Sequence, residues 1–207
     1  MVSVGGQRKS TGESGVRSRF GEESFMSGER QVQVLYDEGT IAERTETLAR
    51  EIAAADPKDL LVVAILKGSF MFAADLLRAL HRAGLDPQVE FFHLSSYLDG
   101  TVSSGTVKIL RDIESTVRDR DVLLVDDILE SGRTLAFAKD LLAARGARRV
   151  LICTMLEKPG KRAVPIEADF VGFVCPDVFV VGYGMDVAHS YRQLPFIGRV
   201  ITADAAA

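Results

Sequence analysis

The chain has 207 residues, 47% of them hydrophobic and 26% charged, and a formal net charge of -4 at pH 7. A chain of this size fits one globular domain with a substantial core and is too short for a second large domain. The net negative charge gives no general attraction to nucleic acid or to an anionic membrane surface, so any bound anion would be held by a local site.

The start of the chain differs in composition from the rest. It is rich in Gly, Ser, Arg and Glu and lacks the apolar core of a secretory signal, so we expect a disordered tail over residues 1–30 and a single domain over residues 31–207. No apolar run approaches the roughly 18 residues that a membrane-spanning helix needs. Cys153 and Cys175 lie in apolar stretches without metal-site or redox spacing, and we expect both to be reduced core residues of a cytoplasmic protein.

Helical and strand-like patterns alternate from residue 41 onward. Apolar residues at helical spacing predict helices, and short continuous apolar runs predict strands buried on both faces. In chain order we expect a helix over 41–55, a strand over 59–66, a helix over 70–84, a strand over 88–94, a polar loop over 95–105, a strand over 121–127, a helix over 133–147, a strand over 149–157, and an edge strand with a small hood over 169–186. This alternation predicts an α/β fold with a mainly parallel, twisted sheet flanked by helices.

Three chemically distinctive segments directly follow predicted strands. They are Lys-Gly-Ser at 67–69, Asp-Asp-Ile-Leu-Glu-Ser-Gly-Arg-Thr at 126–134, and Glu-Lys-Pro-Gly-Lys-Arg at 157–162. In a parallel sheet the ligand crevice lies outside the carboxyl ends of the strands. We therefore expect these segments to meet around one site.

The central segment has the chemistry of a phosphorylated-sugar site. The turn Ser131-Gly132-Arg133-Thr134 precedes a helix, whose unpaired N–H groups and positive dipole end favour a phosphate. Asp126 and Asp127 would repel that phosphate, but they suit sugar hydroxyls or a magnesium ion. The alternative is an ordinary helix start capped by Ser131. The paired aspartates favour the functional interpretation.

The segment VLLVDDILESGRTL (122–135) resembles the diphosphate-sugar motif of the type I phosphoribosyltransferases. Other stretches resemble, in the same order, segments of the bacterial hypoxanthine phosphoribosyltransferases: LKGSF, SSY, LEKP, PDVFVVGYGMD and YRQLPFIG. The resemblance runs from about residue 32 to residue 201. It implies the type I phosphoribosyltransferase fold and a magnesium-dependent enzyme.

The resemblance assigns residues to the sugar donor, 5-phosphoribosyl 1-pyrophosphate. The donor would be bound at its pyrophosphate by Lys67, Gly68, Ser69 and Arg192, and at its 5-phosphate by Ser131, Gly132, Arg133 and Thr134. Asp126 and Asp127 would hold the ribose hydroxyls, and with Asp186 they are the expected magnesium ligands. Ser96 and Tyr97 match a loop that closes over the reacting sugar and excludes water.

The resemblance also assigns the purine site. Lys158 would donate to the oxygen at position 6 of the purine, Phe179 would stack on its face, and Val180 would contact its edge through the main chain. Glu130 would exchange a proton with N7, which makes it and Lys158 the expected catalytic residues. In this family the residue at the position of Glu130 is usually Asp. The extra methylene in Glu130 changes the reach of the carboxylate.

The function that the resemblance implies is purine salvage. The enzyme would transfer the phosphoribosyl group to hypoxanthine, with guanine as a second expected base, forming IMP or GMP and pyrophosphate, and it would act as a homo-oligomer (dimer or tetramer). A xanthine- or pyrimidine-directed transferase remains an alternative. A second alternative, a non-catalytic RNA-binding regulator on the same fold, is disfavoured by the net charge of -4 and the lack of a dense Lys/Arg run. We expect no nucleic-acid or membrane partner.

Overall fold

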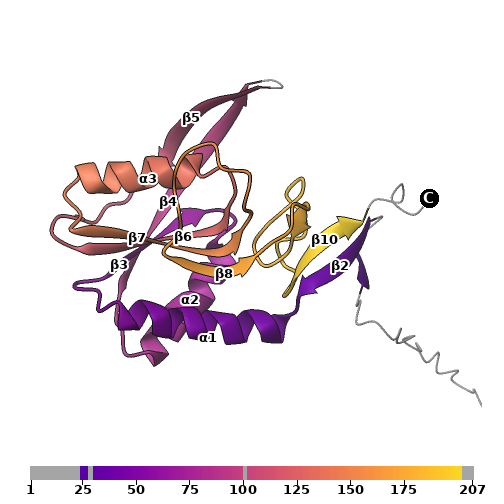
Figure 1. Cartoon of the computed structure of the whole chain (residues 1–207), viewed down its shortest axis with the longest axis horizontal. Helices are drawn as coiled ribbons and strands as arrows, with labels where there is room; N and C mark the ends of the chain where they lie inside the picture. Colours follow the sequence, from indigo (N-terminus) through magenta and orange to yellow (C-terminus); the bar gives the residue numbers. More distant parts are fainter. Residues whose placement is uncertain (1–23, 28–29, 100–101, 202–207) are drawn as a thin grey trace, which may run out of the picture.

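The computed structural model describes residues 24–27, 30–99 and 102–201, which form two sheets of unequal size and three main helices (Figure 1). The larger sheet contains β3 (Leu61–Leu66), β4 (Gln88–Asp99), β5 (Val102–Arg111), β6 (Asp121–Leu129), β7 (Arg149–Glu157) and β8 (Phe170–Val174). The strand order is β5-β4-β3-β6-β7-β8, and every pair is parallel except β4 with β5. The predicted α/β class with a mainly parallel sheet is confirmed.

Helices cover both faces of this sheet (Figure 1). They are α1 (Glu38–Ala54), α2 (Phe70–Arg82) and α3 (Arg133–Ala144). Side chains alternate along β3, so Val62 and Ala64 pack with α1 and α2 on one face, whereas Leu61 and Val63 pack with α3 on the other. A strand buried on both faces is apolar at every position, which explains the uninterrupted apolar runs in the sequence.

The predicted helix and strand boundaries are close to the observed ones. The largest difference at a helix start is in α1, which begins at Glu38 rather than residue 41. There the Asp37 carboxylate accepts the Thr40 N–H at 2.7 Å and caps the first turn. Among the described residues, no helix combines the length and the apolar character that crossing a membrane requires.

Residues 95–99 and 102–105, which were expected to lie in a polar loop, are instead in the long antiparallel strands β4 and β5. His93 pairs with Arg111 near the base of this hairpin and Asp99 with Val102 near its tip. The loop assignment was wrong because it weighted the serines and glycines of this stretch. Its Val, Thr and Tyr residues favour strands, and an Asp-Gly pair at 99–100 is typical of hairpin turns.

The hood is a second, smaller sheet built from both ends of the described chain. It contains β1 (Ser24–Ser27), β2 (Arg30–Tyr36), β9 (Val180–Val181) and β10 (Ile197–Ile201), in the order β1-β2-β10-β9. The sequence analysis predicted the hood but not its strands β1, β2 and β10. Of the expected tail, residues 1–23, 28 and 29 lie outside the described residues, and the rest is in β1 and at the start of β2.

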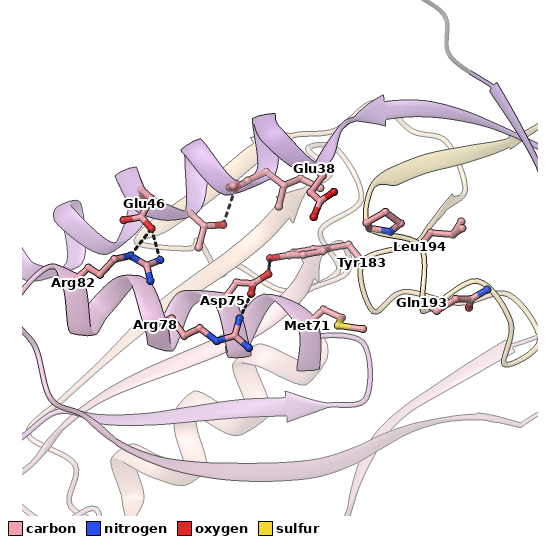
Figure 2. Close-up of a pocket in the computed structure, with 13 residues that line it drawn as sticks. Glu38, Glu46, Met71, Asp75, Arg78, Arg82, Tyr183, Gln193 and Leu194 are labelled. Atoms are coloured by element: carbon pink, nitrogen blue, oxygen red, sulfur yellow. Dashed lines mark hydrogen bonds and ion pairs between the residues drawn. The ribbon is translucent and has the colours of Figure 1, made fainter. Parts of the chain in front are cut away.

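One buried side chain anchors the hood to α2 (Figure 2). The Tyr183 hydroxyl donates to Asp75 Oδ2 at 2.7 Å, and Asp75 Oδ1 accepts from Arg78 at 2.6 Å. Burial and the adjacent carboxylate raise the pKa of Tyr183 well above its ordinary value. The ring lines a cavity of about 440 Å³ between α1, α2 and the hood. The anchor therefore fixes the position of the hood relative to the larger sheet.

Replacing the anchoring tyrosine should lower stability. Tyr183→Phe keeps the ring but removes a hydrogen bond to a charged acceptor, so we expect the free energy of unfolding to fall by about 1.5–3 kcal/mol in urea denaturation. Tyr36→Phe is the matched control, because the Tyr36 hydroxyl donates to the neutral carbonyl of Val174 at an exposed site. A loss for Tyr183→Phe no larger than for Tyr36→Phe would contradict the anchor.

Candidate active site

The polar segments that follow β3 and β6 meet at the carboxyl edge of the larger sheet. A cavity of about 320 Å³ lies there and is lined by Ile65, Leu66, Lys67, Gly68, Leu94, Asp126, Asp127, Ile128, Glu130, Ser131, Gly132, Thr134 and Leu135. The segment after β7 joins its edge through Lys158, whose Nζ lies 3.5 Å from Glu130 Oε1. The strand order brings these segments together, because β6 lies between β3 and β7.

The turn Ser131–Gly132 leads into α3. The first bond of the helix runs from the Ala136 N–H to the Gly132 carbonyl at 2.9 Å, so the amides before it have no acceptor within α3. Gly132 has φ = 76° and a Cβ there would lie 2.4 Å from Ile166 Cγ2, so this position requires glycine. The arrangement leaves N–H groups and the positive helix end at the cavity, as phosphate binding requires.

Asp126 and Asp127 lie side by side on the floor of the cavity. Asp126 is 8% exposed, and its Oδ1 accepts the Asp127 N–H at 3.0 Å. Burial raises the pKa of both carboxyl groups, and repulsion from Asp127 raises that of Asp126 further. The charge of Arg192 acts in the opposite direction on the pKa of Asp127. A buried and a half-buried acid side by side are suited to bind hydroxyl donors or a cation.

These acids fit a magnesium site that is completed by substrate. Within the described residues, no three His, Cys, Asp or Glu side chains gather as a metal-binding group, so Asp186 does not join Asp126 and Asp127 in one. Magnesium is usually held by one or two carboxylates together with phosphate oxygens and water, rather than by an all-protein cage. Asp126 and Asp127 would supply those carboxylates.

The Lys67–Ser69 turn packs directly against the acid pair. The Leu66–Lys67 peptide bond is cis. A Cβ at Gly68 would lie 1.9 Å from Asp127 Oδ2, so only glycine lets the turn approach this closely. The buried Ser69 hydroxyl donates to the Ile65 carbonyl at 2.5 Å, so the serine side chain closes the turn instead of facing a ligand.

Lys158 and Glu130 form an ion pair at this edge of the sheet. Lys158 is 7% exposed, and its main-chain N–H donates to the Leu129 carbonyl at 3.0 Å. The Glu130 side chain is about half exposed. A buried ammonium beside a more accessible carboxylate places one donor and one acceptor side by side at the edge of the cavity.

Four more of the predicted residues, Phe179, Val180, Asp186 and Arg192, lie in the hood and its loops. Phe179 is 58% exposed, so its ring is not a core side chain, and the adjacent Val180 is buried in β9. Arg192 Nη2 lies 2.6 Å from Asp186 Oδ1, while its Nη1 donates to the Gly184 carbonyl at 2.6 Å. The structure thus pairs Asp186 with Arg192 and leaves the Phe179 ring accessible to a ligand.

Two predicted residues, Ser96 and Tyr97, lie on β4 of the hairpin rather than in a loop. The hairpin projects beyond the sheet (Figure 1), and Leu94 at its base lines the cavity. The side chains of Ser96 and Tyr97 lie outside the described residues. A residue to which the sequence analysis gave no role, Arg162, contacts both the Glu130 and Lys158 main chains.

Comparison with known proteins agrees with this geometry. A family model, the phosphoribosyl transferase domain, matches residues 31–188. The hypoxanthine phosphoribosyltransferase of Escherichia coli strain K12 is 42% identical over 176 residues, which cover 84% of this chain and 97% of that protein. The Listeria innocua bifunctional protein TilS/HprT is 46% identical over 183 residues, which cover 88% of this chain and only 28% of that protein.

Solved structures give the same result. A Staphylococcus aureus hypoxanthine phosphoribosyltransferase has a TM-score of 0.78 and 39% identity, covering 84% of this chain and 94% of that one. A Bacillus anthracis hypoxanthine-guanine phosphoribosyltransferase has a TM-score of 0.76 and 41% identity, covering 81% of this chain and 98% of that one. The chain therefore belongs to the phosphoribosyltransferase family.

Proposed function

We propose that this chain is a purine-salvage enzyme that transfers the phosphoribosyl group of 5-phosphoribosyl 1-pyrophosphate to N9 of hypoxanthine or guanine. The bond from C1 of the sugar to pyrophosphate breaks, a C1–N9 bond forms, and IMP or GMP and pyrophosphate leave. The observation that carries the proposal is one cavity edge that joins two adjacent aspartates, an open helix start and the Lys158–Glu130 pair. The hypoxanthine phosphoribosyltransferases among its relatives support the choice of base.

The sugar donor would be held by groups that need no rearrangement. The 5-phosphate binds the amides and hydroxyls of residues 131–134, and Asp126 and Asp127 accept the ribose hydroxyls. Magnesium, held by these carboxylates and the pyrophosphate, neutralises negative charge on the leaving group. Most of the rate enhancement would then come from positioning and electrostatics.

The purine would bind between the hood and the end of β7. Phe179 stacks on its face, the main chain at Val180 contacts its edge, and Lys158 donates to O6. Glu130 takes the proton from N7 as the glycosidic bond forms. Because Lys158 and Glu130 pair at 3.5 Å without substrate, the base replaces one polar partner of each residue instead of desolvating an unpaired charge.

The leaving pyrophosphate would lie against residues 67–69, with Arg192 and Asp186 beside it. The β4–β5 hairpin, through Ser96 and Tyr97, would close over the reacting sugar. Closure has a physical purpose, because water in the site would hydrolyse the activated sugar. We further propose that the protein is cytoplasmic, that residues 31–207 form one domain, and that the protein assembles as a homo-oligomer. Val89 and Phe91 lie two positions apart on β4, and both apolar side chains are exposed, which supports an oligomer.

A panel of bases tests the proposed reaction. Initial rates with the sugar donor should be high for hypoxanthine and guanine, low for xanthine, adenine and uracil, and lost when magnesium is removed with a chelator. The 6-oxo group distinguishes the first pair from adenine because Lys158 is a donor. Faster turnover of xanthine or uracil would indicate a transferase directed at another base.

Removing the Phe179 ring should affect the base site selectively. Stacking on an aromatic side chain contributes about 1–3 kcal/mol, so Phe179→Ala should raise KM for hypoxanthine about fivefold to 150-fold. KM for the sugar donor, measured in the same variant, is the internal control and should change little. Equal increases in both would remove Phe179 from the base site.

Glu130 should act as a general base. Glu130→Gln keeps the shape of the side chain but cannot accept the N7 proton, so kcat should fall by roughly a hundredfold to ten-thousandfold. KM for the sugar donor should stay near wild type. Glu130→Asp keeps a carboxylate at this position and should retain much of the activity. If Glu130→Gln instead kept kcat and weakened only the donor, Glu130 would belong to the phosphate loop and not to the proton transfer.

A further inference from the structure

Arg162 lies in the segment that follows β7, behind the loop that leads into α3. Its Nη1 donates to the carbonyl oxygens of Leu129 at 2.9 Å and Glu130 at 2.7 Å, both at the end of β6. The same nitrogen lies 3.3 Å from the Lys158 carbonyl, at the end of β7. One guanidinium therefore bridges the phosphate loop and the main chain of the purine-binding lysine.

The other nitrogens of Arg162 fix the guanidinium itself. Nε donates to the Ile166 carbonyl at 3.2 Å, and Nη2 forms an ion pair with the Glu157 carboxylate. The side chain is 21% exposed. Each of the three guanidinium nitrogens has an acceptor, and one of these acceptors is a charged carboxylate. The guanidinium therefore has little freedom to rotate.

These bonds set the direction of the phosphate-loop amides. In a trans peptide the C=O and the next residue's N–H point in opposite directions, and the peptides here are trans. Turning the Leu129 and Glu130 carbonyls toward Arg162 therefore turns the Glu130 and Ser131 N–H groups away from it. The Ser131 carbonyl accepts the Ala163 N–H at 2.9 Å, which orients the Gly132 N–H in the same manner.

The carbonyls of Leu129, Glu130 and Ser131 thus face the segment that contains Arg162. Their hydrogen bonds to this segment fix the directions of the N–H groups that follow them, those of Glu130, Ser131 and Gly132. Runs of amides oriented in this way form anion-binding concavities. The backing segment also packs tightly, since Ile166 fills the space that a side chain at residue 132 would need. Arg162 donates to two of the three carbonyls, those of Leu129 and Glu130, and the Leu129 carbonyl also accepts the Lys158 N–H.

We propose that Arg162 is a positioning residue that builds the phosphate and purine subsites together. It orients the amides that bind the 5-phosphate and fixes the main chain from which Lys158 reaches the base. It touches neither substrate. The inference rests on the proposed function, because it takes the loop after Ser131 as the phosphate site and Lys158 as the base donor.

The substitution Arg162→Lys tests this role. Lysine keeps a positive charge, but its single nitrogen cannot serve at once the carbonyls that Nη1 contacts, the Ile166 carbonyl that Nε contacts and the Glu157 carboxylate that Nη2 contacts. Because at least two hydrogen bonds are lost, we expect KM for the sugar donor and KM for hypoxanthine each to rise about tenfold or more.

Arg44→Lys is the matched control. The Arg44 guanidinium is also partly buried, and its side chain is 25% exposed. It donates to the carbonyls of Gly172 at 2.9 Å and Val171 at 2.7 Å, and it forms an ion pair with Glu51 at 2.8 Å. None of these partners lines the candidate active site. Arg44→Lys should lower the thermal midpoint and leave both KM values unchanged.

Nucleotide binding gives a readout that stability alone does not change. IMP and inosine differ only in the 5-phosphate, so the ratio of their affinities, measured by calorimetry, reports the phosphate subsite. This ratio should fall in Arg162→Lys and equal the wild-type value in Arg44→Lys. If Arg162→Lys lowers only the thermal midpoint, as the control does, the positioning role is overturned.

Two further outcomes are decisive. If Arg162→Lys has no cooperative unfolding transition, Arg162→Gln replaces it, because a glutamine amide cannot supply the bonds that Nε, Nη1 and Nη2 make. A wild-type IMP-to-inosine ratio in Arg162→Gln would overturn the inference. If the wild-type protein fails to turn over hypoxanthine, the proposed function is wrong, and the ratio in the variants still decides whether Arg162 orients a phosphate site.

Discussion

Asp126 and Asp127 place two carboxylates side by side where β6 enters the cavity, and the described residues around them offer little positive charge in return. Burial and mutual repulsion raise the pKa of Asp126, and only Arg192 lowers that of Asp127 through its charge. Buried like charges oppose folding unless something compensates for them. The surrounding structure tolerates the pair because the rest of β6 is an apolar strand held between β3 and β7. The proposed sugar donor and its magnesium would bring hydroxyl donors and positive charge that compensate for these carboxylates.

The parallel sheet converts this local feature into a complete site. Because β3, β6 and β7 run in the same direction and lie next to one another, the segments after all three strands open on the same edge. Gly68 and Gly132 then allow the first two segments to approach other parts of the chain more closely than any side chain would permit. Residues about 90 positions apart, such as Lys67 and Lys158, thus reach one small region without any long-range specific contact between them.

Much of the larger sheet was predictable because burial on both faces leaves a plain trace, an uninterrupted apolar run. The hood strands were not, since β2 and β10 are paired only through contacts between the two ends of the chain, and local patterns carry no information about such pairing. The hairpin was missed because its serines resemble a loop. The aspartates and the phosphate turn were evident from residue types, whereas Arg162 acts on main-chain carbonyls, which no sequence pattern reveals.

The hood has a consequence for synthesis on the ribosome. β10 (Ile197–Ile201) lies between β2 and β9 in the hood sheet. The strand β9, which follows Phe179, therefore joins the amino-terminal strands β1 and β2 only by pairing with β10. Chains emerge from the amino terminus, and every strand of the larger sheet precedes β9 and β10. A nascent chain therefore completes the larger sheet, with the turn at 131–134 and the acid pair, before the hood. Premature termination shortly before Ile197 would leave a product with the phosphate turn and acid pair but without an assembled hood.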